Sequence, residues 1–171
     1  MSSDTFTTAL FLITAVIAAG VLISAIFPVV YQMAGTFSSA GHASDQRLRT
    51  DFKIVLAVAN GSTPDTRYAR VWMKNTGSEQ IPDSDLKRSD VICGNTGDFN
   101  RMSLSGSSTL ADGQWLYILS DLNNNNYWDP GETVEINAKT PTLDVSGSPN
   151  YFQFTLPDGI WRSDQFTANA L

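Results

Sequence analysis

The residues best suited to chemistry lie in one short segment, DLNNNNYWDPGE, between two apolar runs. Calcium loops of the EF-hand type place oxygen ligands at the first, third, fifth, seventh, ninth and twelfth of twelve positions, because a hard cation prefers oxygen. The segment has oxygen donors at all six, the seventh through a backbone carbonyl. The predicted Ca2+ ligands are Asp121, Asn123, Asn125, Tyr127, Asp129 and Glu132.

The segment departs from that pattern in two ways. Asn126 occupies the sixth position, where glycine is usual, although asparagine also tolerates positive φ. The flanks WLYILS and ETVEINAK are typical of strands rather than helices, so the expected affinity is weak, on the order of 10⁻⁴–10⁻³ M. The alternative is a long hairpin connection in which asparagine adopts left-handed conformations at little cost.

The composition excludes several classes of function. The chain has 171 residues, a formal charge of −6 and a pI near 4.5, which is unsuited to nucleic acid because phosphate binding needs Lys and Arg. A single cysteine, Cys93, cannot form an internal disulfide and is expected to be buried. The single histidine, His42, leaves little for zinc or for imidazole catalysis.

An apolar N-terminal segment precedes the strand-like runs that flank the loop. No charged residue lies between Thr5 and Gly41, and Phe6 to Val30 is almost continuously apolar. As a helix this run is ~37 Å long, enough for a hydrocarbon core of ~30 Å. The start MSSD lacks the basic residues of a secretory signal or of a pilin-type processing site, so we expect the helix to be retained. Pro28 is expected to kink or end it.

Within residues 1–50, Tyr31 to Thr50 is expected to be partly helical, either as a frayed continuation of the helix or as a flexible stalk. Small residues along the apolar helix favour either an ordinary anchor or a helix that bundles with copies of itself; they are Ala15, Ala18, Ala19, Gly20 and Ser24. All eleven Lys and Arg follow residue 46, which leaves the orientation across the membrane open, because long domains translocate largely regardless of charge.

Residues 51–171 are predicted to form an all-β, immunoglobulin-like antiparallel sandwich. About eight short strand-like runs alternate with turn clusters, and no amphipathic helical pattern interrupts them. Four aromatic residues are expected to pack in its core: Trp72, Trp115, Phe152 and Phe154. The tripeptide Asn60-Gly61-Ser62 is an N-glycosylation sequon in a predicted loop, and its use stays open.

Several motifs, in their order along the chain, carry a family resemblance. The apolar helix is followed by VWMKNTGSEQIP (Val71 to Pro82), WDPGE (Trp128 to Glu132) and FTLPDGIWRSDQFTA (Phe154 to Ala168). Together they resemble the archaeal flagellar accessory protein G family (FlaG), over most of the chain. The first motif is similar to a strand-plus-turn signature, WDPGE to a turn that opens a late strand, and LPDG to the last hairpin.

This resemblance implies a single-pass membrane protein of the archaellum, the motility machinery. Its β domain would lie outside the cytoplasmic membrane, against the surface layer, and act with a sister protein, F, as a stationary anchor. It also implies assembly into a homo-oligomer or helical filament through the helix. The asparagine run is not carried over from the family, so the Ca2+ prediction depends on its own spacing.

Two other functions compete with the anchor. An archaellin- or pilin-like filament subunit shares the helix-plus-sandwich plan, but the chain lacks the processing signal. A membrane-tethered enzyme is disfavoured, because His42 lies in the stalk and no glycine-rich phosphate loop or HExxH pair is present. Acidic pairs such as Asp83 and Asp85 are expected to be solvated surface residues.

Overall fold

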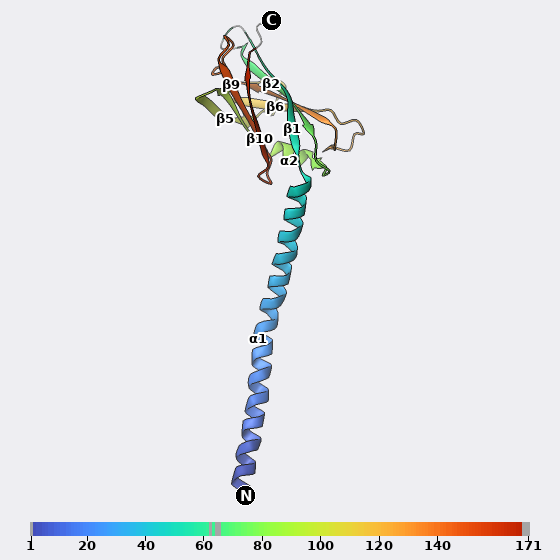
Figure 1. Ribbon diagram of the computed structural model, residues 1–171, viewed down its shortest axis with the longest axis vertical. Helices are drawn as coiled ribbons and strands as arrows, with labels where there is room; N and C mark the ends of the chain where they lie inside the picture. The colour runs from blue at the N-terminus through green and yellow to red at the C-terminus, as the bar shows by residue number, and fades with distance from the viewer. Residues whose placement is uncertain (1, 62, 64–65, 169–171) are drawn as a thin grey trace. The chain divides into compact units, whose positions relative to one another are not determined.

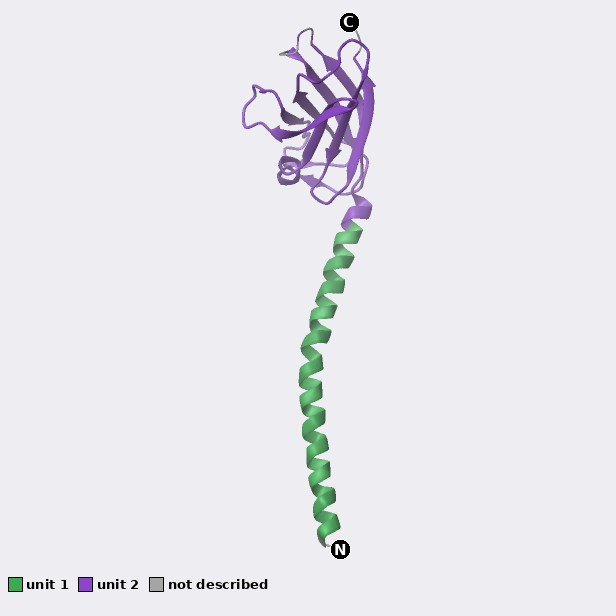
Figure 2. Ribbon diagram, turned by 90° about the vertical axis from the view of Figure 1, so that its left-hand side faces the viewer, with its two compact units in different colours: residues 1–45 green, residues 46–171 purple. Residues whose placement is uncertain are grey.

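The computed structural model describes residues 2–168 with the exception of 62, 64 and 65. It consists of two compact units, Met1–Asp45 and Gln46–Leu171 (Figure 2). The sequon at Asn60 includes Ser62, so that part of the motif lies outside the described residues.

One continuous helix, α1 (Ser2–Arg49), includes both the apolar segment and the expected stalk (Figure 1). It continues through Pro28, so proline does not end it. Its hydroxyl groups donate to carbonyls one turn earlier, as from Thr14 Oγ1 to the carbonyl of Leu10 at 2.8 Å. These bonds satisfy polar groups that lipid would not. The stalk is more helical than predicted because no proline follows Pro28 before Arg49.

The predicted β-rich runs all form strands: β1 (Phe52–Asn60), β2 (Tyr68–Asn75), β4 (Asp90–Asn95), β5 (Asp98–Leu104), β6 (Gln114–Leu119), β8 (Thr133–Lys139), β9 (Pro149–Thr155) and β10 (Trp161–Thr167). Sequence patterns missed three shorter elements: β3 (Ile81–Pro82), α2 (Asp83–Lys87) and β7 (Tyr127–Trp128). Elements of two to five residues are too short to show a period of 2 or 3.6.

The strands pair in the order β1-β2-β8-β6-β5-β4-β9-β10. Two antiparallel groups, β1-β2-β8-β6 and β5-β4-β9-β10, meet in a short parallel ladder at Ser103↔Gln114 and Leu104↔Trp115. The mostly antiparallel sandwich that the sequence predicts is therefore confirmed, and it is consistent with an immunoglobulin-like plan.

Aromatic residues from both groups of strands fill the core. Phe154 of β9 makes edge-to-face contacts with Phe52 and Trp115, at ring-centroid distances of 5.6 and 6.1 Å. Trp115, Phe152 and Phe154 are buried as predicted, whereas Trp72 is only half-buried and lies beside Arg70. Cys93 is buried as expected, and burial raises its pKa to about 12.

Candidate functional site

The asparagine loop, residues 121–132, connects β6 to β8 and contains β7. Asn124 and Asn126 have φ values of 58° and 61°, so Asn126 adopts the positive φ that asparagine was expected to tolerate at this position. β7 pairs with β3 through Ile81↔Trp128 and Pro82↔Tyr127. The loop therefore has both its own turn structure and a second attachment to the sandwich.

Asp121 organises the first half of this loop. Its carboxylate accepts the backbone N–H groups of Asn125 and Asn126, at 3.3 and 2.8 Å. Partial desolvation raises the pKa of Asp121, but bonds from the N–H groups of the asparagines outweigh it and hold that pKa below its ordinary value. The ionised carboxylate thus acts as a cap for the turn.

Asp129 accepts three side-chain amides. The Nδ2 groups of Asn123 and Asn125 donate to its Oδ2 at 2.7 and 2.9 Å, and Gln80 Nε2 donates to its Oδ1 at 2.7 Å. The Oδ1 of Asn125 in turn accepts the backbone N–H of Tyr127 at 2.8 Å. The predicted ligands at places three, five, seven and nine are therefore joined in one network.

Glu132 closes the loop from inside the domain, with only 7% of its surface exposed. Its Oε1 accepts the N–H of Leu122 at 2.8 Å, and its Oε2 accepts the N–H of Asp129 at 3.0 Å. One buried carboxylate thus connects the beginning of the loop to its end. Because these are charge-assisted bonds, the loop is stiffened by its own side chains.

Ca2+ binding in this loop stays a prediction. Among the described residues no group of three or more His, Cys, Asp or Glu side chains is arranged to hold a metal ion. An ion would depend on oxygens of Asn123 and Asn125, whose amide nitrogens face Asp129. Binding would require those two amides to turn their oxygens inward.

If Ca2+ binds with a Kd of ~1 mM, then 10 mM Ca2+ should stabilise the wild-type chain by ~1.4 kcal/mol. Calorimetry in Ca2+ and in a chelator measures this shift. The matched variant is Asp121→Ala with Glu132→Ala, which is expected to melt lower in both buffers and to show no Ca2+ response. Identical wild-type melting in the two buffers would discard the prediction.

A second cluster, which the sequence did not predict, lies where α1 ends and β1 begins. The turn from Asn75 to Glu79, here called the exit turn, wraps this point. The N–H groups of Ser78 and Glu79 donate to the carbonyl of Arg49 at 2.8 and 3.3 Å. Those of Thr76 and Gly77 donate to the carbonyl of Asp51 at 2.9 and 2.8 Å. The exit turn thus satisfies the carbonyl of Arg49, which the helix end leaves unpaired, and the carbonyl of Asp51 just beyond it.

The exit turn can lie this close because residue 77 is glycine. A Cβ atom there would lie 2.4 Å from the carbonyl oxygen of Arg49 and 2.5 Å from the nitrogen of Asp51. Both are backbone atoms that cannot rotate away, and real Cβ contacts essentially never fall below 3.0 Å. Gly77 is therefore required for the contact between the turn and the helix end.

Asn75 connects the exit turn to the WDPGE turn. It is 1% exposed, and its Nδ2 donates to the carbonyls of Glu79 and Trp128, at 2.9 and 2.8 Å. Its Oδ1 accepts the N–H of Gly77 at 3.0 Å, and its own carbonyl accepts the N–H of Gly131 at 2.8 Å. A single buried amide thus joins the helix end to the loop that Glu132 closes.

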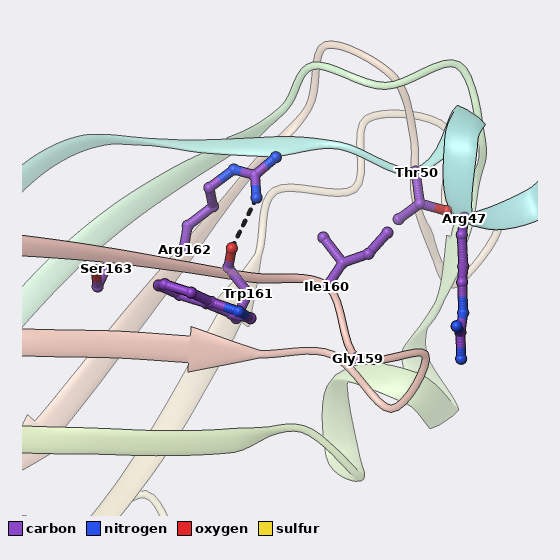
Figure 3. Close-up of a pocket in the computed structure, with 7 residues that line it drawn as sticks. All are labelled: Arg47, Thr50, Gly159, Ile160, Trp161, Arg162 and Ser163. Atoms are coloured by element: carbon purple, nitrogen blue, oxygen red, sulfur yellow. Dashed lines mark hydrogen bonds between the residues drawn. The ribbon is translucent and has the colours of Figure 1, made fainter.

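An ion pair and a shallow depression complete this end of the domain. Arg162 of β10 pairs with Asp51 and lies over the ring of Phe52. Beside it is an open depression of about 530 Å³ with a half-exposed Trp161 at its side (Figure 3). Its lining residues are Arg47, Thr50 and residues 159–163. The Arg162 guanidinium also donates to the carbonyl of Trp161 at 2.7 Å.

Two of the sequence motifs that carry the family resemblance contribute residues to this cluster. VWMKNTGSEQIP contains the exit turn, and WDPGE contains the buried Trp128, whose Nε1 donates to the carbonyl of Glu132 at 2.9 Å. WDPGE precedes β8, and LPDG forms the β9–β10 turn, in which Leu156 N–H donates to the Ile160 carbonyl at 2.8 Å. Both motifs therefore form the turns that the resemblance implies.

Comparisons with known proteins agree with this architecture. A family model described as archaeal-type flagellin matches residues 2–166. A protein of Archaeoglobus fulgidus, described only as uncharacterized, is 25% identical over 169 residues, which is 98% of this chain and 99% of that protein.

Three solved structures share the fold. The archaellum periplasmic stator protein FlaG from Sulfolobus acidocaldarius is 23% identical, with a TM-score of 0.50 over 68% of this chain and 99% of that chain. A complex of FlaF and FlaG from the same organism matches with 22% identity and a TM-score of 0.50, over 67% of this chain and 87% of that one. The archaeal flagellum of Methanospirillum hungatei is 15% identical, with a TM-score of 0.55 over 91% of each chain. The predicted resemblance to FlaG is thus confirmed as a likeness of fold.

Proposed function

Because the chain belongs to the archaeal-type flagellin family and is an archaellum-related structural protein, we propose that it is a membrane-anchored part of the archaellum machinery. In this proposal α1 stays in the mature protein and spans the cytoplasmic membrane. The sandwich lies outside and links the motor to the cell envelope or surface layer. It acts mechanically and not as an enzyme.

The observation that carries this proposal is the exposed apolar surface of α1. Its large apolar side chains all project outward; Phe6, Phe11 and Val21 are 69%, 71% and 65% exposed. By its length and apolar composition the helix is able to cross a membrane. Because its sides are apolar all round rather than on one stripe, lipid covers it better than a single protein face would.

A filament subunit remains the second candidate, and one feature of α1 favours it. Small or apolar residues recur three and four positions apart beyond the lipid-length segment, at Ala34, Phe37, Gly41 and Ser44. In water such a stripe is covered best by another helix. An intact Met1 in the mature protein, read by mass spectrometry, supports the anchor, whereas a processed N-terminus supports the filament subunit.

The proposed partners follow from the same comparison. A complex between FlaF and FlaG has been solved for the relative, so a sister protein F is the first partner to test. A surface-layer protein and further copies of this chain are the other proposed partners. Each would meet the sandwich on the outer side of the membrane.

Charges placed in the span should abolish membrane integration. Ile13→Lys combined with Ile17→Lys adds two charges on one helix face, each costing ~2.5–3.5 kcal/mol at the membrane centre. We expect the double variant to be extracted by alkaline carbonate, while the wild-type chain remains in the membrane pellet. Ser39→Lys with Ala43→Lys, at the same spacing outside the apolar run, is the matched control. Complete extraction of the wild-type chain would contradict the proposal.

A further inference from the structure

The β6 strand has an open edge along half its length. It pairs with β8 from Gln114 to Leu119, but with β5 only at Gln114 and Trp115. Ser105 N–H donates to the Trp115 carbonyl at 2.8 Å, so residue 115 directs its backbone groups toward β5. Because backbone direction alternates along a strand, Tyr117 and Leu119 direct theirs to the same side, where the described residues supply no pairing strand.

This open edge lacks the features that usually prevent strands from pairing between molecules. QWLYILS, residues 114–120, contains no charge and no proline. By contrast, β1 carries Lys53 and a register shift between Ile54 and Leu56, and β10 carries Arg162 and Asp164. Charged side chains and bulges protect exposed edges, so β1 and β10 are protected and β6 is not.

Apolar surface lies directly beside the open backbone groups. Ile118 is 54% exposed, and an open depression of about 650 Å³ runs along the strand. Leu104, Leu116 and Tyr117 line it together with Lys87 and residues 105–108. An arriving strand would thus gain backbone hydrogen bonds and bury aliphatic side chains in the same step.

We propose that this edge is an interface between two copies of the chain, which pair β6 with β6 in antiparallel fashion about a twofold axis. An uncharged strand meets its own copy without like-charge repulsion, although each chain carries a formal charge of −6. The pairing extends the β1-β2-β8-β6 group into a continuous sheet across the two copies. An interface of this kind is self-complementary and closes as a dimer.

The free backbone groups determine the register. Tyr117 and Leu119 must each find a partner, and Trp115 is already bonded to Ser105. Antiparallel pairing of Tyr117 with Leu119 of the other copy uses all of these groups and places Ile118 opposite its own equivalent. Ile118 then forms a pair without backbone hydrogen bonds, in which the Cα atoms lie ~4.5 Å apart. In this register the two Leu116 residues are offset by four positions, which is ~13 Å along the strand at ~3.3 Å per residue.

Disulfide trapping in the full chain, in native membranes, tests this register. Ile118→Cys is expected to give a covalent dimer on mild oxidation, because a Cα separation of ~4.5 Å falls within the range of disulfides. Leu116→Cys, on the same strand and the same face, is expected to remain monomeric. The native thiol of Cys93 does not interfere because it is buried and its pKa is raised to about 12.

A second variant keeps the test independent of Ile118. In the proposed register Leu116 of one copy lies opposite Ser120 of the other. A chain that carries both Leu116→Cys and Ser120→Cys is therefore expected to form a covalent dimer. The proposal is overturned if oxidation leaves both Ile118→Cys and the double variant monomeric. It is equally overturned if Leu116→Cys alone dimerises as readily as Ile118→Cys.

Discussion

Replacing Gly77 with alanine should lower the free energy of unfolding of the sandwich by ~3 kcal/mol or more, in the range of strongly destabilising single substitutions. The added Cβ meets the carbonyl oxygen of Arg49 and the nitrogen of Asp51 at 2.4 and 2.5 Å, and both belong to backbone. The exit turn must therefore withdraw and lose its bonds to the helix end. Urea unfolding of the full chain in detergent, followed by tryptophan fluorescence, measures the change.

Gly106→Ala is the matched control for this experiment. A Cβ at Gly106 meets no atom within 4 Å and that residue has no positive φ, so its stability should remain within ~0.5 kcal/mol of wild type. A Gly77→Ala chain as stable as the Gly106→Ala chain would show that the helix end does not depend on the close approach of the exit turn.

Asn75→Ala should be nearly as damaging, with a loss of ~3 kcal/mol. The substitution leaves the carbonyls of Glu79 and Trp128 without the Nδ2 donor of Asn75, whereas the N–H of Gly77 keeps its bond to the carbonyl of Asp51. Each orphaned buried group costs ~1–3 kcal/mol, reduced where water enters. The same unfolding measurement applies.

Asn137→Ala is the matched control, because it shows how much stability is lost when an asparagine is removed from a less buried position. Asn137 bonds Arg70 and Glu135 on a half-buried outer face of the sheet, where water can replace it. Its loss should cost ~1 kcal/mol or less. Equal losses at positions 75 and 137 would mean that Asn75 does not join the two turns.

Gly77 and Asn75 matter for the proposed mechanical role. Force that passes between α1 and the sandwich must cross the backbone from Arg49 to Asp51. The exit turn holds both of those residues by backbone hydrogen bonds, and Asn75 holds the exit turn to the core. We therefore expect cells that carry Gly77→Ala or Asn75→Ala to swim less well than wild-type cells, when the two contain equal amounts of the protein.

The sequence predicts best what depends on local pattern. The helix over Phe6 to Val30 follows from composition, and the strands follow from alternation between turn clusters, so both agree with the structure. The positive φ of Asn126 follows from its place in a loop pattern. Burial of Trp115 follows from the same alternation, because β6 has one face toward the core.

What the sequence did not predict depends on contacts between distant segments. The role of Asn75 is set by Trp128 and Gly131, more than fifty residues away in the chain. The need for glycine at position 77 comes from the helix end, not from the turn itself. In the asparagine loop the spacing places the side chains together, but the direction of each amide is set by Asp129.

The central claim is that α1 remains in the membrane of the mature protein with the sandwich on the outer side. The most direct measurement is labelling of a Ser148→Cys chain in intact cells with a membrane-impermeant maleimide, since residue 148 is exposed and Cys93 is buried. The account predicts labelling of intact cells, on a chain that still begins at Met1 and sediments with the membrane. Labelling that requires cell lysis would contradict it.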